Sequence, residues 1–128
     1  MDAIALLGHC YERGVMVKQD YKRALDYYTA AAELNNSLSF NNLGSLYETG
    51  RGVEMNLKKA REYYERSAEL GNACGLYNLG SIYHYGKEVS VNYKKAIECY
   101  EMAGIKRKHA GALANLALLY ENGHGVEK

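Results

Sequence analysis

The chain repeats itself with a period of 36 residues, and this period constrains its fold more than any other feature. Each unit carries a Leu-Gly pair, then a tyrosine, a glycine and a valine at constant offsets; in the second unit these are Leu43, Gly44, Tyr47, Gly50 and Val53. Periods of this length are typical of solenoids, in which a unit buries its apolar face only by stacking on its neighbours. The equivalent pairs elsewhere are Leu7-Gly8, Leu79-Gly80 and, after 37 residues, Leu116-Ala117.

Each unit has the pattern of two helices. Apolar or small residues at helical spacing in the second unit are Phe40, Leu43, Gly44 and Tyr47, then Leu57, Ala60, Tyr64 and Ala68. Gly50 suits the left-handed end of the first helix, and Asn56, like Asp20 and Asn92, suits the N-cap of the second. Gly44 and Gly80 would let the two helices approach closely. The sequence therefore predicts seven helices, near residues 2–13, 20–34, 37–49, 56–70, 73–85, 92–105 and 110–122.

A few positions depart from the pattern. Met16 and Glu88 replace the second glycine of the turn, and Asn35 and Arg107 occupy the glycine position at the end of a unit. One extra residue lies within 104–108. We expect these changes to alter local turns and not the fold. Ala117 in the helix-glycine position suggests that Gly80→Ala would be mild.

The pattern resembles the Sel1-like repeat family, a relative of the tetratricopeptide repeat. The residues that carry the resemblance in the second unit run from 42 to 53 and continue with Asn56, Lys59-Ala60, Tyr63-Tyr64 and 67–71. The tetratricopeptide period is about 34 residues, and the longer Gly-x-Gly-Val turn favours the Sel1-like type. The resemblance implies an all-α, right-handed α-solenoid of stacked antiparallel helix pairs.

On this basis we expect one Sel1-like repeat domain over 1–128, with repeats at about 1–36, 37–72 and 73–109 and a partial repeat at 110–128. The sequence stops before the next second helix would begin, so we expect it to be part of a longer protein.

Composition excludes several classes of function. The formal net charge is +1, which is not the basic surplus of a nucleic-acid-binding protein. No apolar run is long enough for membrane insertion, and no signal peptide is visible. Three cysteines without paired spacing indicate neither a disulfide framework nor a metal site, and they favour a cytoplasmic location, with the endoplasmic reticulum lumen or secretion left open.

The sequence contains no motif for catalysis, metal binding or a cofactor. Motifs such as HExxH, the P-loop, GxSxG and SxxK are absent. The four histidines, His9, His84, His109 and His124, lack metal-ligand spacing and are expected at the surface. We therefore predict a non-enzymatic protein with no small-molecule substrate.

Most tyrosines recur at fixed repeat positions, which indicates packing. These are Tyr11, Tyr47, Tyr83 and Tyr120 on the first helices, and Tyr28, Tyr64 and Tyr100 on the second. Tyr77 and Tyr85 differ, because their counterparts are Asn41 and Thr49. We expect these two to be free for recognition.

A recurring asparagine is the strongest candidate for a binding site. It precedes the core leucine of the first helices, and asparagine is a poor helix former, so it needs another role. Two roles remain open: hydrogen bonds between repeats, or a ladder of amides on the concave face that grips an extended backbone. The candidate partner-binding residues are Asn42, Asn78, Asn115, Ser45, Ser81, Tyr77, Tyr85 and Leu38.

The function we expect is a protein–protein interaction scaffold that binds a protein or peptide on its concave face. The resemblance implies adaptor roles in signalling, in quality control at the endoplasmic reticulum or in host–bacterium contact. The alternative is a regulatory repeat region of a larger enzyme or of a ubiquitin-ligase or signalling complex. A hydrolase acting on cell-wall or β-lactam-like substrates is a third interpretation, disfavoured because SxxK and the paired cysteines of some relatives are absent.

Overall fold

The computed structural model describes residues 3–124, and within this range it holds seven α-helices, one π-helical segment and no strand. The helices are α1 (Ala3–Arg13), α2 (Tyr21–Glu33), α3 (Ser37–Thr49), α4 (Leu57–Glu69), α5 (Ala73–Tyr85), α6 (Tyr93–Glu101) and α7 (Ala110–Glu121), and the π-helical segment is η1 (Met102–Lys106). The expected all-α fold is confirmed, with most boundaries within one residue. The expected helix start at residue 2 lies outside the described residues.

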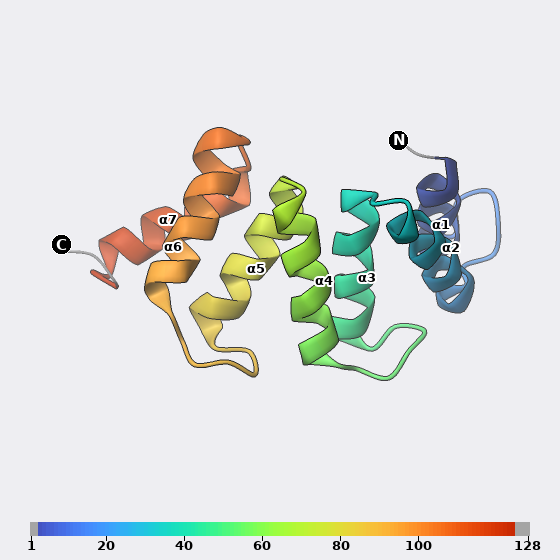
Figure 1. Cartoon of the computed structure of the whole chain (residues 1–128), viewed down its shortest axis with the longest axis horizontal. Helices are drawn as coiled ribbons and strands as arrows, with labels where there is room; N and C mark the ends of the chain where they lie inside the picture. Colours follow the sequence, from blue (N-terminus) through green and yellow to red (C-terminus); the bar gives the residue numbers. More distant parts are fainter. Residues whose placement is uncertain (1–2, 125–128) are drawn as a thin grey trace.

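The helices form a solenoid of stacked hairpins. Each first helix packs against the second helix of its own unit, and each second helix packs against the next first helix. The elements follow one another in a row from one end of the molecule to the other (Figure 1). Because α3 also contacts α5 directly, the first helices of successive units share one face.

Capping side chains begin the helices as the sequence predicts. Asn56 accepts a hydrogen bond from the Lys59 backbone N–H at 3.0 Å, and Asn92 does the same for Lys95. Asp20 caps α2 in the same way. The first helices also have caps that the sequence analysis did not identify, namely Asn36, Asn72 and His109.

The turns tolerate the departures from glycine. Met16 has φ 65° and Glu88 has φ 56°, so both adopt the left-handed conformation that Gly52 takes in the second unit. The residue that takes this conformation at the end of the third unit is Lys108, with φ 58°, and the expectation for Arg107 is wrong. The reason is the extra residue, which η1 accommodates by widening the last turn of the helix.

A glycine faces a buried tyrosine in each complete unit. Tyr28, Tyr64 and Tyr100 are at most 1% exposed. A Cβ atom at Gly44 would lie 2.6 Å from the Tyr64 ring, and one at Gly80 would lie 2.8 Å from the Tyr100 ring. The expected close approach is confirmed. The expectation that Gly80→Ala is mild is wrong, because no tyrosine covers Ala117 in the described chain.

Two expectations about exposure are also wrong. Tyr120, expected to be packed, is 44% exposed because no second helix covers α7 among residues 3–124. His84, expected at the surface, is only 8% exposed. The three cysteines are free and partly buried, and burial raises the pKa of the Cys99 thiol to about 11.

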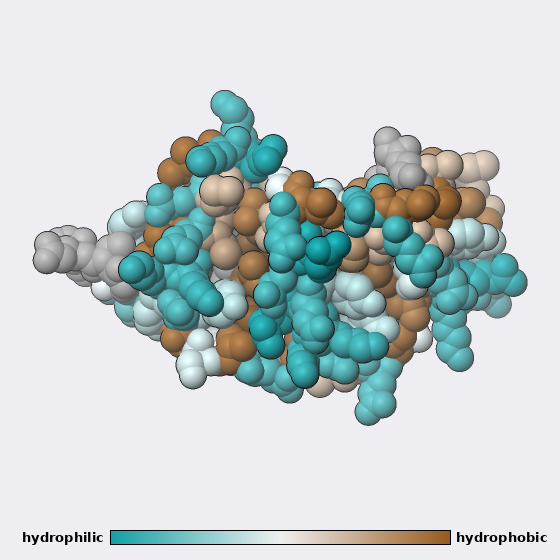
Figure 2. Space-filling model, viewed as in Figure 1, coloured by the Kyte–Doolittle hydropathy of each residue, from teal (hydrophilic) through white to brown (hydrophobic). Residues whose placement is uncertain are grey.

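Hydrophilic side chains gather over α4 in the middle of the view in Figure 2, with hydrophobic patches on either side. Among the described residues, no helix is both long and apolar enough to cross a membrane.

Candidate interaction cleft

An acidic residue on the first helix holds the hydroxyl group of the buried tyrosine. Tyr28 donates a 2.6 Å hydrogen bond to Glu12, and Tyr64 donates a 2.7 Å bond to Glu48. Burial is the largest cause that raises the pKa of both tyrosines, and the bonded carboxylates add to it. Both hydroxyl groups therefore stay protonated and act as donors.

A cation from the next unit pairs with each of these carboxylates. Arg51 Nη1 lies 3.6 Å from Glu12, and Lys87 Nζ lies 2.6 Å from Glu48. Arg51 and Lys87 are separated by one repeat period, so the same triad of tyrosine, acid and base joins two successive pairs of units. The triad is a polar link between repeats.

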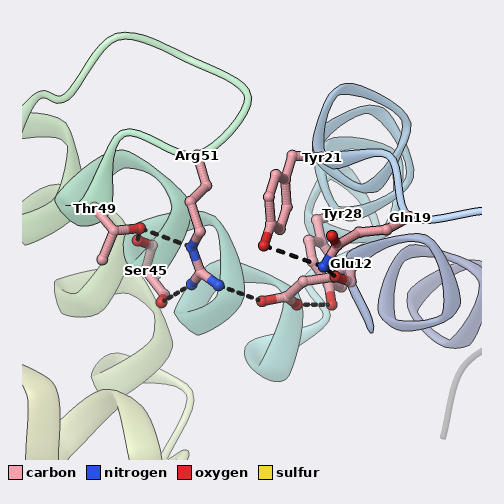
Figure 3. A network of polar contacts seen from close by, with 7 residues as sticks. All are labelled: Glu12, Gln19, Tyr21, Tyr28, Ser45, Thr49 and Arg51. Atoms are coloured by element: carbon pink, nitrogen blue, oxygen red, sulfur yellow. Dashed lines mark hydrogen bonds and ion pairs between the residues drawn. The ribbon is translucent and has the colours of Figure 1, made fainter. Parts of the chain in front are cut away.

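Arg51 is held in place by several further contacts (Figure 3). Its guanidinium group donates to Thr49 Oγ1 at 2.9 Å and to Ser45 Oγ at 3.1 Å. It also lies over the ring of Tyr21, 5.4 Å from the centroid. An arginine fixed in this way presents a positive charge in a defined position.

The third interface replaces the ionic triad with histidines. His84 stands in the position of Glu12 and Glu48, and its Nδ1 lies 3.1 Å from the Tyr100 hydroxyl oxygen. His124 stands in the position of the cation and stacks on Tyr93 at 4.4 Å. Burial, and secondarily the charge of His124, lowers the pKa of His84, so this link is uncharged at neutral pH.

A cleft of about 610 Å³ opens between the first and second units, beside the Arg51 triad. Its lining is mostly polar and charged, and it comes from α1, α3, α5 and the two turns. The lining residues are His9, Glu12, Arg13, Gln19, Tyr21, Leu38, Asn41, Asn42, Ser45, Arg51 and Asn78.

The recurring asparagines join successive first helices, with one exception. Asn78 Nδ2 donates to Asn41 Oδ1 at 2.7 Å, and Asn115 Nδ2 donates to the Tyr77 hydroxyl oxygen at 3.3 Å. In each case the acceptor precedes the asparagine position of the previous unit. For Asn42 the residue at that place is Ala5, whose methyl group accepts no hydrogen bond. The Asn42 carboxamide has no hydrogen-bond partner among residues 3–124, and it lines the cleft.

The structure divides the eight predicted site residues between two places. Leu38, Asn42, Ser45 and Asn78 line the cleft. Tyr77, Asn115 and Ser81 instead surround Tyr100, and Tyr77 also stacks on His109 at 4.7 Å. Tyr85 is 58% exposed and stacks on His84. Binding by these eight residues remains a prediction.

Sequence reasoning missed the charged part of the cleft, above all Glu12, Arg13 and Arg51. A signal for the acidic member was present, because Tyr-Glu recurs at residues 11–12, 47–48 and 120–121. A cation follows at a fixed offset in Arg51 and Lys87. Within residues 3–124 no group of three His, Cys, Asp or Glu side chains is placed to hold a metal ion.

Comparisons with known proteins match this architecture. A family model described as the Sel1 repeat matches residues 2–36, 41–72, 75–105 and 110–128. None of the curated proteins compared with the chain matches it.

Three solved structures are similar. A protective antigen present in uropathogenic Escherichia coli strains, which displays an SLR fold, has TM-score 0.89 and 33% identity over 93% of this chain and 26% of its own. A Sel1 repeat protein from Oxalobacter formigenes has TM-score 0.87 and 31% identity over 98% of this chain and 51% of its own. Cysteine rich protein B from Helicobacter pylori has TM-score 0.73 and 28% identity over 89% and 92%. The chain thus spans about a quarter and about half of the first two.

Proposed function

This chain belongs to the Sel1 repeat family, and from that premise we propose that it binds an extended segment of a partner protein in the cleft between its first two units. Sel1 repeat proteins are generally protein-interaction scaffolds, and their fold is a typical non-enzymatic one. The particular surface and the kind of segment bound are our proposal.

The observation that carries the proposal is the unpaired carboxamide of Asn42. A carboxamide offers two donors and an acceptor, which is the complement of one peptide unit. Its counterparts Asn78 and Asn115 spend their donors on neighbouring repeats. Asn42 contributes no such link, and it faces a cleft large enough for several residues of an extended peptide.

The charges in the cleft favour an acidic side chain in the bound segment. Glu12 is already paired with Arg51 and bonded to Tyr28. Arg13 is exposed and has no ion-pair partner among residues 3–124. One uncompensated positive charge therefore remains at the cleft, and binding should weaken as salt screens it.

The experiment that tests the proposal is selection of peptides from a random displayed library on the purified chain, followed by affinity measurement of the enriched peptides. Asn42→Ala should reduce the affinity by about tenfold, the effect of losing hydrogen bonds to a buried peptide unit. Arg13→Gln should reduce it mainly at low salt. The matched control is Lys94→Ala, on the exposed side of α6.

Equal affinity for the wild-type chain and Asn42→Ala would contradict the proposal. Enriched peptides that bind with unchanged affinity to both cleft variants, and that lose affinity with the Lys94 control, would assign binding to the opposite face.

A further inference from the structure

The outer side of α7 is an uncovered version of a surface that is covered in the complete units. Leu113 is 43% exposed and Tyr120 is 44% exposed. The residues in the Leu113 position of the two preceding units, Phe40 and Leu76, are 8% and 6% exposed. The same side chains that are buried in those units are thus open on α7.

The complete units show what covers this surface. The second helix places a tyrosine on the helix glycine and a cation over the ring of the first-helix tyrosine. The cation lies 5.2 Å from the ring centroid for Lys59 over Tyr47, and 4.9 Å for Lys95 over Tyr83. The occupant is therefore a basic helix, and the cation precedes the buried tyrosine by five residues in each unit.

Ala117 prevents the same occupant from fitting α7. In the three complete units, a Cβ atom at the helix glycine would come within 2.8 Å of the tyrosine ring. Ala117 carries that Cβ. A helix in the usual register would have to carry a side chain smaller than tyrosine at this point.

The polar groups on this side of α7 are also open. Glu121 stands where Glu12 and Glu48 accept the tyrosine hydroxyl group, and it is exposed with no hydrogen bond or ion pair in the described chain. The Tyr120 ring has no cation over it among these residues. Both features attract a positively charged partner.

We propose that the outer side of α7 docks a basic amphipathic helix supplied by a partner protein. The helix places a Lys or Arg over Tyr120 and, five residues later, a side chain smaller than tyrosine against Ala117, with an apolar residue against Leu113. This surface is separate from the cleft between the first two units, because it lies at the opposite end of the row of helices (Figure 1).

The test uses fluorescently labelled peptides with the sequence of residues 92–107, the second-helix segment of the third unit, titrated with the full 128-residue chain. The peptide with Tyr100→Ala should bind the chain, and the unchanged peptide should bind about tenfold more weakly, as overpacking against a methyl group predicts. In the Ala117→Gly chain the unchanged peptide should bind at least as well as the Tyr100→Ala peptide.

The cation is tested separately on the Tyr100→Ala peptide. A Lys95→Gln change should weaken its binding several-fold, and the Tyr120→Leu chain should no longer distinguish the two peptides. Lys94→Gln is the matched control, because Lys94 contacts no ring in the structure and should have little effect. The proposal is overturned if neither peptide binds, or if Ala117→Gly leaves the preference between the peptides unchanged.

Discussion

The hydroxyl group of Tyr64 donates a 2.7 Å hydrogen bond to the carboxylate of Glu48, although the two residues lie on different helices of the same unit. The carboxylate also pairs with Lys87 of the next unit. One buried tyrosine thereby connects the interior of a helix hairpin to the interface between hairpins, and the contact recurs as Tyr28 with Glu12.

Removing this hydroxyl group should destabilise the solenoid. Tyr64→Phe leaves the ring against Gly44 but deprives Glu48 of its donor, which should lower the free energy of unfolding by about 1.5–3 kcal/mol. Urea denaturation followed by circular dichroism measures the change. Tyr63→Phe is the matched control, because the Tyr63 hydroxyl group has no hydrogen-bond partner in the described chain. An equal effect of both substitutions would contradict the role of Glu48.

Alkaline pH should unfold the protein through its buried tyrosines. Folding raises the pKa of Tyr28, Tyr64 and Tyr100 above the ordinary value of 10.0. Their contribution to stability is therefore complete below pH 10 and is lost as the pH rises above it. In a titration of tyrosinate absorbance, these three should ionise only together with the loss of helical circular dichroism. Ionisation of all tyrosines before unfolding would refute this.

Mild acid should weaken the third interface through His84. The pKa of His84 is lowered from 6.5 in the folded state by burial, so the unfolded chain binds the proton more readily. Stability should fall as the pH drops through 6.5 toward the lowered pKa, and this group should cause no further loss below it. The groups that face His84 are Tyr85, Tyr93, Tyr100 and His124.

The comparison that isolates this effect is between the wild-type chain and His84→Gln, which can still accept the Tyr100 hydroxyl group. The urea midpoint of the wild-type chain should decrease more between about pH 7.5 and pH 5.5 than that of the variant. Parallel decreases in the two proteins would exclude His84 as the cause.

Enlarging Gly80 should destabilise the third unit. Gly80→Leu should lower the free energy of unfolding by about 1–3 kcal/mol, because the added side chain meets the Tyr100 ring and Cys99. Gly80→Ala should also destabilise, with part of the loss offset by the better helix propensity of alanine. Thermal or urea unfolding measures both. Ala117→Ser on the open side of α7 is the control and should be nearly neutral.

The asparagines should separate stability from binding. Asn78→Ala and Asn115→Ala should each lower the free energy of unfolding by about 0.5–1.5 kcal/mol, because both remove a bond between repeats. Asn42→Ala should leave stability unchanged or slightly raised, since alanine is the better helix former. Urea unfolding of the three single variants distinguishes these outcomes. A loss of stability for Asn42→Ala equal to that for Asn78→Ala would mean that all three only join repeats.

The helices and their order follow from local sequence patterns. Gly50, Asn56 and the apolar spacing around Leu43 act within a few residues, so their consequences can be worked out from the sequence. The periodicity then fixes how many hairpins stack. For the same reason the close approach at Gly44 was predictable, because it recurs at one position of each unit.

What the sequence by itself determined is therefore the solenoid of helix hairpins, because each unit repeats the same caps, turns and apolar spacing. What only the tertiary structure decided is which side chains meet between units: that Asn78 reaches Asn41 while Asn42 finds only Ala5, and that His84 lies buried against Tyr100. The widened turn in η1 and the open side of α7 belong to the same class. These contacts join residues about one repeat apart or on different helices, and their distances depend on how the hairpins stack, which no local pattern specifies.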